Sequence, residues 1–100
     1  MRIAQEEIFG PVVVVIPYTD EDDAVSQAND SLYGLAGAVW AADADHARAV
    51  ASRLRTGRVR INGAPLDKRA THGGFKLSGV GREWGHVGIE EFLEYQSVIG

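Results

Sequence analysis

The sequence predicts an α/β fold in which a largely parallel sheet is built from βαβ units. Three short apolar segments alternate with two segments whose apolar residues recur at helical spacing. Strands that alternate with helices in this way are typical of parallel sheets joined by helical crossovers. Of the 100 residues, 45% are hydrophobic and 24% are charged, a composition typical of a globular protein. We therefore expect residues 1–100 to fold as one domain or as part of one.

Three apolar segments are expected to form the strands of this sheet. The first, Val12–Ile16, is β-branched throughout and lies between two prolines. Such a run is typical of a strand that is buried on both faces of a parallel sheet. The second strand is expected over residues 35–40 and the third over 58–62. In the third, Arg58 and Arg60 alternate with apolar residues and would form the polar face.

Two amphipathic helices are expected between these strands. The first begins at Thr19 and Asp22, which resemble a capping box, and ends near residues 29–31. The second is capped by Asp43 and ends at Gly57. Apolar residues recur at helical spacing in both segments, at Ala24, Val25, Ala28 and Leu32 in the first and at Ala47, Val50, Ala51 and Leu54 in the second.

The remaining third of the chain is rich in glycine. Seven glycines between Gly63 and Gly88 break any periodicity, which predicts a structured loop region. Their spacing matches neither a P-loop nor a dinucleotide-binding fingerprint. Ile89 and the apolar pair Phe92 and Leu93 then indicate a short helix, and residues 96–99 are expected to form a terminal strand.

Charge is unevenly distributed along the chain, whose formal net charge is −4. Residues 1–47 hold nine acids and one base, whereas residues 48–100 hold five acids and nine bases. The basic half does not predict a nucleic-acid surface, because Arg53 and Arg55 fall in the expected last turn of the second helix. Cations at that place complement the helix dipole. We therefore expect no nucleic-acid partner.

Other classes of protein are disfavoured by what the sequence lacks. No apolar run without glycine is longer than Val12–Ile16, which is far short of the ~18 residues of a membrane span. The first residues lack the apolar core of a secretory signal, so we expect a cytoplasmic protein without membrane contacts. The three histidines are far apart in sequence and predict no metal site, and zero cysteines exclude disulfides and a thiol nucleophile within this chain.

Five ordered motifs carry a resemblance to a known family. These are Gln5–Pro11 (QEEIFGP), Ala28–Asn29 with Tyr33–Gly37 (AN and YGLAG), Gly57–Gly63 (GRVRING), Gly73–Glu83 (GGFKLSGVGRE) and Gly88–Glu94 (GIEEFLE). Together they resemble the C-terminal part of the NAD(P)-dependent aldehyde dehydrogenase superfamily over about 95 residues. The resemblance implies that residues 1–100 are the C-terminal part of an aldehyde dehydrogenase catalytic domain.

Members of this family are several times longer, and the resemblance places their main catalytic groups outside this chain. A Rossmann-like cofactor domain, a cysteine nucleophile and a glutamate base all precede the matched part. The chain has no cysteine, so we expect it to be catalytically inactive alone. The alternative is a truncated interaction module that associates with full-length subunits. The family forms dimers and tetramers, which implies a homo-oligomer with residues 96–99 in an intersubunit sheet.

The resemblance also implies roles for individual residues. Glu7 corresponds to a glutamate that binds the nicotinamide ribose of NAD or NADP, and Phe9 to an aromatic residue beside that ribose. Leu35 corresponds to a residue of the nicotinamide pocket. Packing or surface roles remain the alternatives for these three residues. None of them is a catalytic residue, and no metal is implied.

His72 departs from the family pattern, in which many members have phenylalanine as an apolar wall of the aldehyde channel. The sequence here reads Thr71-His72 before two glycines. With Lys68 and Arg69 nearby, this substitution predicts an aldehyde substrate that is polar or bears a carboxylate. Returning His72 to phenylalanine in a complete enzyme is then expected to favour apolar aldehydes.

Overall fold

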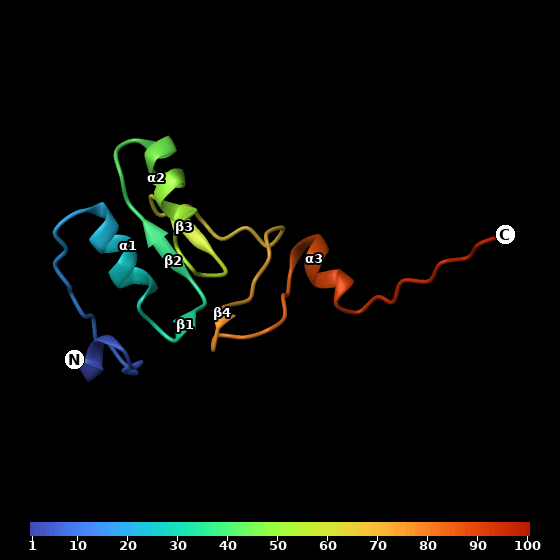
Figure 1. Ribbon diagram of the computed structural model, residues 1–100, viewed down its shortest axis with the longest axis horizontal. Helices are drawn as coiled ribbons and strands as arrows, with labels where there is room; N and C mark the ends of the chain where they lie inside the picture. The colour runs from blue at the N-terminus through green and yellow to red at the C-terminus, as the bar shows by residue number, and fades with distance from the viewer.

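The computed structural model describes all residues, Met1–Gly100, as three α-helices and two small sheets followed by an extended tail (Figure 1). The elements in chain order are η1 (Arg2–Ala4), α1 (Glu21–Asn29), β1 (Tyr33–Gly34), β2 (Gly37–Val39), α2 (Ala44–Ala51), β3 (Val59–Ile61), β4 (Phe75–Lys76) and α3 (Gly85–Glu90). The chain is elongated, with principal extents of 62 × 32 × 23 Å. None of the helices has the length and apolar character of a membrane-spanning segment.

The centre of the fold is a βαβ unit made of β2, α2 and β3. The two strands pair in parallel, with Gly37 opposite Val59 and Val39 opposite Ile61. Helix α2 packs against both strands (Figure 1). Its Ala47 is completely buried. The predicted α/β fold class is therefore confirmed, although both strands are shorter than the predicted ranges.

The N-cap of helix α1 lies one residue after Thr19, the N-cap that the sequence predicted. Asp20 is its N-cap, and the carboxylate of Asp20 accepts a hydrogen bond from the backbone N–H of Asp23 at 2.8 Å. The Asp23 carboxylate in turn accepts from the backbone N–H of Thr19 at 2.9 Å. This hydrogen bond is the largest cause of the lowered pKa of Asp23, and a hydrogen bond from the Gln27 side chain is the second cause. The reciprocal capping was predicted, but Asp20 and Asp23 provide it instead of Thr19 and Asp22.

Helix α2 begins at the predicted cap, because Asp43 accepts from the N–H of Asp45. It ends at Ala51, however, and the prediction of an end at Gly57 was wrong. The physical reason is the side chain of Asn29, which donates to the Arg53 carbonyl at 3.0 Å and accepts from the Arg55 N–H at 2.7 Å. These bonds satisfy backbone groups that a longer helix would use. Arg53 and Arg55 therefore follow the helix instead of forming its last turn.

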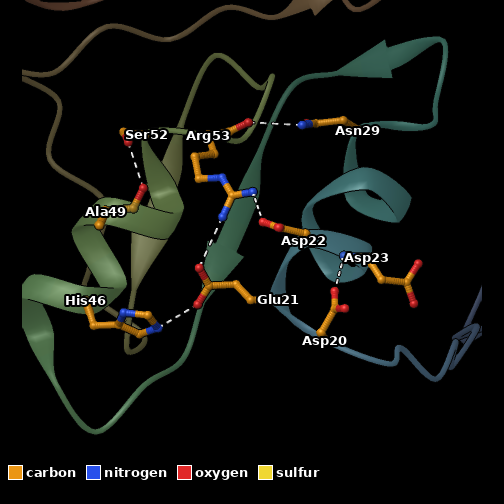
Figure 2. A network of polar contacts seen from close by, with 9 residues as sticks. All are labelled: Asp20, Glu21, Asp22, Asp23, Asn29, His46, Ala49, Ser52 and Arg53. Atoms are coloured by element: carbon orange, nitrogen blue, oxygen red, sulfur yellow. Dashed lines mark hydrogen bonds and ion pairs between the residues drawn. The ribbon is translucent and has the colours of Figure 1, made fainter.

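Ionic contacts also join α1 to α2 and to the segment that follows α2 (Figure 2). The Glu21 carboxylate contacts His46 Nε2 at 2.7 Å and Arg53 Nη1 at 3.1 Å. Arg53 also reaches Asp22, and this contact is the main cause of the raised pKa of the Arg53 guanidinium. His46 lies on an exposed helix face, as predicted, and joins the two helices there.

The predicted strand Val12–Ile16 does not form. Its side chains are 38% to 87% exposed, and its backbone lacks a ladder of hydrogen bonds to another strand. Exposure alternates along the run, with Val12 at 44% and Val13 at 85%, as expected of an extended segment. A strand needs at least one neighbouring strand for its backbone hydrogen bonds, and no other element of this chain lies beside Val12–Ile16 in that way.

The C-terminal elements also differ from the sequence prediction. Helix α3 covers Gly85–Glu90, so it includes Ile89 but ends before Phe92 and Leu93. Residues 96–99 form no strand and run outward as an exposed tail (Figure 1). The predicted terminal strand was wrong for this chain because no other strand lies beside residues 96–99.

A second sheet was not predicted. It pairs β1 with β4 in antiparallel fashion, with Tyr33 opposite Lys76 and Gly34 opposite Phe75. Each strand is two residues long, too short for any periodic pattern to reveal it. This small sheet brings the glycine-rich region against the segment that follows α1.

Candidate functional site

A groove of about 430 Å³ lies between the N-terminal segment and the segments that precede β2 and β3. We call it the Glu7 groove. Its lining includes several hydroxyl-bearing side chains and both Glu7 and Leu35. Its residues are Ala4, Gln5, Glu6, Glu7, Ala28, Ser31, Tyr33, Gly34, Leu35, Ala36, Thr56 and Ser78.

Three side chains hold the walls of the Glu7 groove together. Gln5 Nε2 donates to the Asp30 carbonyl at 3.1 Å and so fixes the N-terminal segment against the end of α1. Ser78 Oγ accepts from the backbone N–H of Gly34 at 3.0 Å. Lys76 Nζ donates to the carbonyls at the end of α1, at 2.8 Å each. The glycine-rich region therefore holds the segment that follows α1, which forms part of the groove.

The two adjacent carboxylates in this groove differ in their surroundings. Glu6 is paired with Arg2, whose Nε donates to Glu6 Oε1 at 3.0 Å. Glu7 makes no side-chain hydrogen bond or ion pair within the chain. Since an ionised carboxylate only accepts hydrogen bonds, Glu7 offers a free acceptor to a ligand with hydroxyl groups.

Phe9 and Leu35 are placed differently from each other. Phe9 is 87% exposed and does not line the Glu7 groove. Leu35 is 43% exposed and lines both the Glu7 groove and a second groove. Of the three residues expected to contact a cofactor, the structure thus brings two together.

The second groove has a volume of about 360 Å³ and contains His72. We call it the His72 groove. The glycine-rich region forms most of it, and Leu35 and Ser78 line both this groove and the Glu7 groove. Its residues are Leu35, His72, Gly73, Gly74, Ser78, Gly79, Val80, Gly81, Arg82, Glu83, Glu91 and Phe92.

His72 is held by three neighbours. Its backbone exchanges two hydrogen bonds with Glu83, at 2.7 and 2.6 Å. Its ring lies against the indole of Trp84, with centroids 4.7 Å apart, and its Nδ1 lies 3.4 Å from Nη1 of Arg58. The sequence did not predict Arg58 or Trp84 as part of a site. Arg58 was expected on a polar strand face, but it precedes β3 and is half-buried beside His72.

The two other cations expected near His72 lie elsewhere. Neither Lys68 nor Arg69 lines the His72 groove. Arg69 binds Asp67, with Nη2 and Oδ2 2.7 Å apart, and this hydrogen bond lowers the pKa of Asp67 to about 2. The structure contains no group of three or more His, Cys, Asp or Glu residues that could hold a metal ion.

Comparison with known proteins identifies the family. The model of the aldehyde dehydrogenase family matches residues 1–98. The chain belongs to the aldehyde dehydrogenase family. Its resemblance to that family, predicted from five sequence motifs, is thereby confirmed.

Curated relatives share more than half of their matched residues with this aldehyde dehydrogenase chain. A 3-succinoylsemialdehyde-pyridine dehydrogenase from a Pseudomonas species is 57% identical over 100 residues, which cover all of this chain and 21% of the relative. A geranial dehydrogenase from Castellaniella defragrans is 55% identical over 97 residues, covering 97% of this chain and 20% of the relative. The chain therefore spans about a fifth of the length of the relatives it matches. Because these relatives are named for different aldehydes, overall identity does not select a substrate.

Solved aldehyde dehydrogenases have the same fold over the matched part. An enzyme from Mycobacterium tuberculosis in complex with NAD+ superimposes with a TM-score of 0.88 at 51% identity, over 92% of this chain and 19% of the enzyme. A variant of aldehyde dehydrogenase C from Pseudomonas syringae, in complex with NAD+ and octanal, superimposes with a TM-score of 0.91 at 52% identity. This match covers 94% of this chain and 19% of that enzyme. The architecture of residues 1–100 is thus that of a segment of this family.

Proposed function

We propose that residues 1–100 form one wall of the active site of an NAD(P)-dependent aldehyde dehydrogenase, which oxidises an aldehyde to a carboxylic acid. The observation that carries this proposal is that two grooves, one lined by Glu7 and the other by His72, share Leu35 and Ser78 in their linings. An oxidation by hydride transfer requires that cofactor and substrate occupy adjoining sites. Relatives in complex with NAD+, one of them also with octanal, support the assignment.

The residues of the Glu7 groove fit the nicotinamide ribose of NAD or NADP. Ribose hydroxyls donate hydrogen bonds, and Glu7 offers a carboxylate that no side chain within the chain uses. Leu35 supplies apolar surface in the same groove, and the exposed ring of Phe9 is available to pack beside the ribose. When bound, NAD(P) supplies the hydride acceptor, while these residues bind and orient it.

His72 is proposed as a wall of the aldehyde channel. Its groove adjoins the Glu7 groove, so a substrate beside His72 would lie next to the cofactor position. An imidazole in place of a family phenylalanine favours an aldehyde that bears a polar group or a carboxylate.

Residues 1–100 are proposed to be inactive without the rest of an aldehyde dehydrogenase. The nucleophile of the family is a cysteine, and this chain has none. A catalyst that depends on a positioned nucleophile, base and cofactor loses its rate advantage when these groups are absent. The chain would therefore contribute binding contacts and not the reacting groups.

The role of Glu7 is testable in a graft enzyme, in which this chain replaces the matched segment of the M. tuberculosis relative. Glu7→Gln removes the charged acceptor and is expected to raise the KM for NAD+ or to lower kcat at least tenfold. Glu6→Gln is the matched control, because Glu6 is already paired with Arg2. Equal kinetics for the two variants would contradict the assignment of Glu7.

A second candidate function is an interaction module that associates with full-length subunits as part of an oligomer. The observation in its favour is the exposed surface, which measures 8134 Å², whereas a folded monomer of 10.8 kDa exposes about 5,500 Å². Apolar side chains from Val12–Ile16 and from the tail contribute to this excess, with Val98 89% exposed. An excess of this size favours a surface that other protein covers.

Light scattering separates this candidate from simple aggregation. The chain would be mixed with full-length subunits of a relative and measured over a dilution series. A defined stoichiometry supports the interaction module. Open-ended growth of mass with concentration contradicts it and indicates unpaired strand edges.

A further inference from the structure

The ring of His72 lies between an aromatic ring and a guanidinium. Trp84 packs against it with a centroid distance of 4.7 Å and an interplanar angle of 33°. Arg58 Nη1 lies 3.4 Å from Nδ1 of the imidazole. Since the backbone of His72 is also fixed by its two hydrogen bonds to Glu83, little freedom remains for the ring.

The contact between Arg58 Nη1 and His72 Nδ1 fits one tautomer of a neutral imidazole. A guanidinium has five N–H donors and no acceptor, and it remains protonated in proteins. Nδ1 must therefore present its lone pair to Arg58, which leaves the proton of the neutral ring on Nε2. In the other tautomer, an N–H of His72 would point at an N–H of Arg58.

The Arg58 side chain also contains a buried nitrogen. Its Nε is the one buried side-chain polar atom in the structure without a hydrogen-bond partner. An unpaired buried donor is costly, so surrounding contacts must hold the guanidinium in place. Arg58 thus brings to His72 the positive charge that the sequence had assigned to Lys68 and Arg69. The carboxylates of Glu83 and Glu91 belong to the same groove lining as His72.

We propose that Arg58 is a positioning residue that holds His72 as the neutral Nε2–H tautomer. The Nε2–H is then the single N–H donor of the ring, and His72 belongs to the lining of the His72 groove. Such a donor favours aldehydes whose far end carries a hydrogen-bond acceptor, such as a ketone or carboxylate oxygen, over aliphatic aldehydes of the same length. This substrate class rests on the proposed function, whereas the tautomer of His72 does not.

The tautomer is measured by long-range proton–nitrogen NMR of the 100-residue chain labelled at histidine. The signal of His72 Nδ1 is expected at the position of an unprotonated nitrogen, with a nuclear Overhauser contact between His72 and Trp84. Arg58→Met is expected to shift the Nδ1 signal toward that of a tautomer mixture, and Arg58→Lys, which keeps a cationic donor, is expected to shift it less. His86, which is exposed, is the internal control and should not change.

Two results overturn the proposal. The first is a protonated Nδ1 or a missing Trp84 contact in the unmodified chain. The second is an unchanged Nδ1 signal in Arg58→Met and in Arg58→Gln, a second variant that keeps most of the side-chain length without charge.

The substrate class is tested in the graft enzyme by the ratio of kcat/KM for a 4-oxo aldehyde to that for an aliphatic aldehyde of equal length. Arg58→Met is expected to lower this ratio roughly tenfold, and the effect should vanish when His72 is phenylalanine. A ratio that falls equally in both backgrounds overturns the role of Arg58. A graft that oxidises neither aldehyde contradicts the proposed function and leaves the NMR result to decide the tautomer.

Discussion

Lys76 and Asn29 are 47 positions apart in sequence, yet Nζ of Lys76 donates to the backbone carbonyl of Asn29 at 2.8 Å. The same Nζ also donates to the Ser31 carbonyl at 2.8 Å. A cation at this place caps the carboxyl end of α1, where the helix leaves unpaired carbonyls and partial negative charge. The contact therefore connects α1 to the glycine-rich region that forms part of both grooves.

Replacement of Lys76 is expected to loosen this connection. Lys76→Met should lower the free energy of unfolding by about 1 kcal/mol, because two charge-assisted hydrogen bonds and the dipole interaction are lost. Lys68→Met is the matched control, since the Lys68 side chain makes no hydrogen bond in the structure. Urea denaturation measures both variants. Equal stability of the two would contradict the capping role.

Gly57 is expected to tolerate no side chain. A Cβ added there would collide with the carbonyl oxygen of Gly73, and because this oxygen belongs to the backbone, it cannot move aside as the end of a flexible side chain could. Gly57→Ala should destabilise the chain by about 2 kcal/mol and disturb the segment next to His72. At Gly81 the nearest atom to an added Cβ is 4.0 Å away, so Gly81→Ala is the control and should be near neutral. Thermal unfolding of the two variants gives the comparison.

Asp67 is expected to titrate at low pH. The side-chain and backbone hydrogen bonds from Arg69 lower its pKa to about 2. Since the folded pKa lies below the unfolded value of about 4, the pairing stabilises the fold above pH 4 and is lost as pH falls toward 2. Carboxyl carbon NMR follows the titration directly. Arg69→Gln should return the midpoint to about 4, whereas Lys68→Gln should leave it near 2.

His72 is expected to influence which aldehydes the graft enzyme prefers. His72→Phe removes the imidazole donor and adds apolar surface, so kcat/KM should rise for aliphatic aldehydes and fall for those with a carboxylate or ketone, by roughly tenfold in their ratio. His86→Phe is the control, because His86 is exposed and contacts Glu90 instead of either groove. An unchanged ranking of substrates would disprove the assignment of His72 to the channel.

The sequence predicted those elements whose stabilising contacts are local. The caps and apolar stripes of α1 and α2 lie within a few residues of one another, so the pattern located both helices to within several residues. The parallel pair β2 and β3 was also predicted, because α2 lies between the two strands and packs against both. The family resemblance came from motifs and needed no knowledge of contacts.

The failures concern contacts between distant parts of the chain. Helix α2 stops early because the Asn29 side chain takes backbone groups 24 and 26 residues away, which no periodicity reveals. Val12–Ile16 has the composition of a buried strand, but strand formation depends on neighbours that the chain does not supply. Arg58 was missed at the candidate site because alternation along a strand says nothing of what lies opposite a side chain.

The most direct measurement of the central claim is the rate of reduced nicotinamide formation, followed by absorbance with NAD+ or NADP+ and a panel of aldehydes. The chain alone is predicted to give no rate above the blank, because it lacks the cysteine nucleophile. The graft enzyme, which adds the remaining four fifths of a relative, is predicted to oxidise at least one aldehyde. Turnover by the chain alone, or a folded graft that binds NAD+ without turnover, would contradict the claim that residues 1–100 form one wall of an aldehyde dehydrogenase active site.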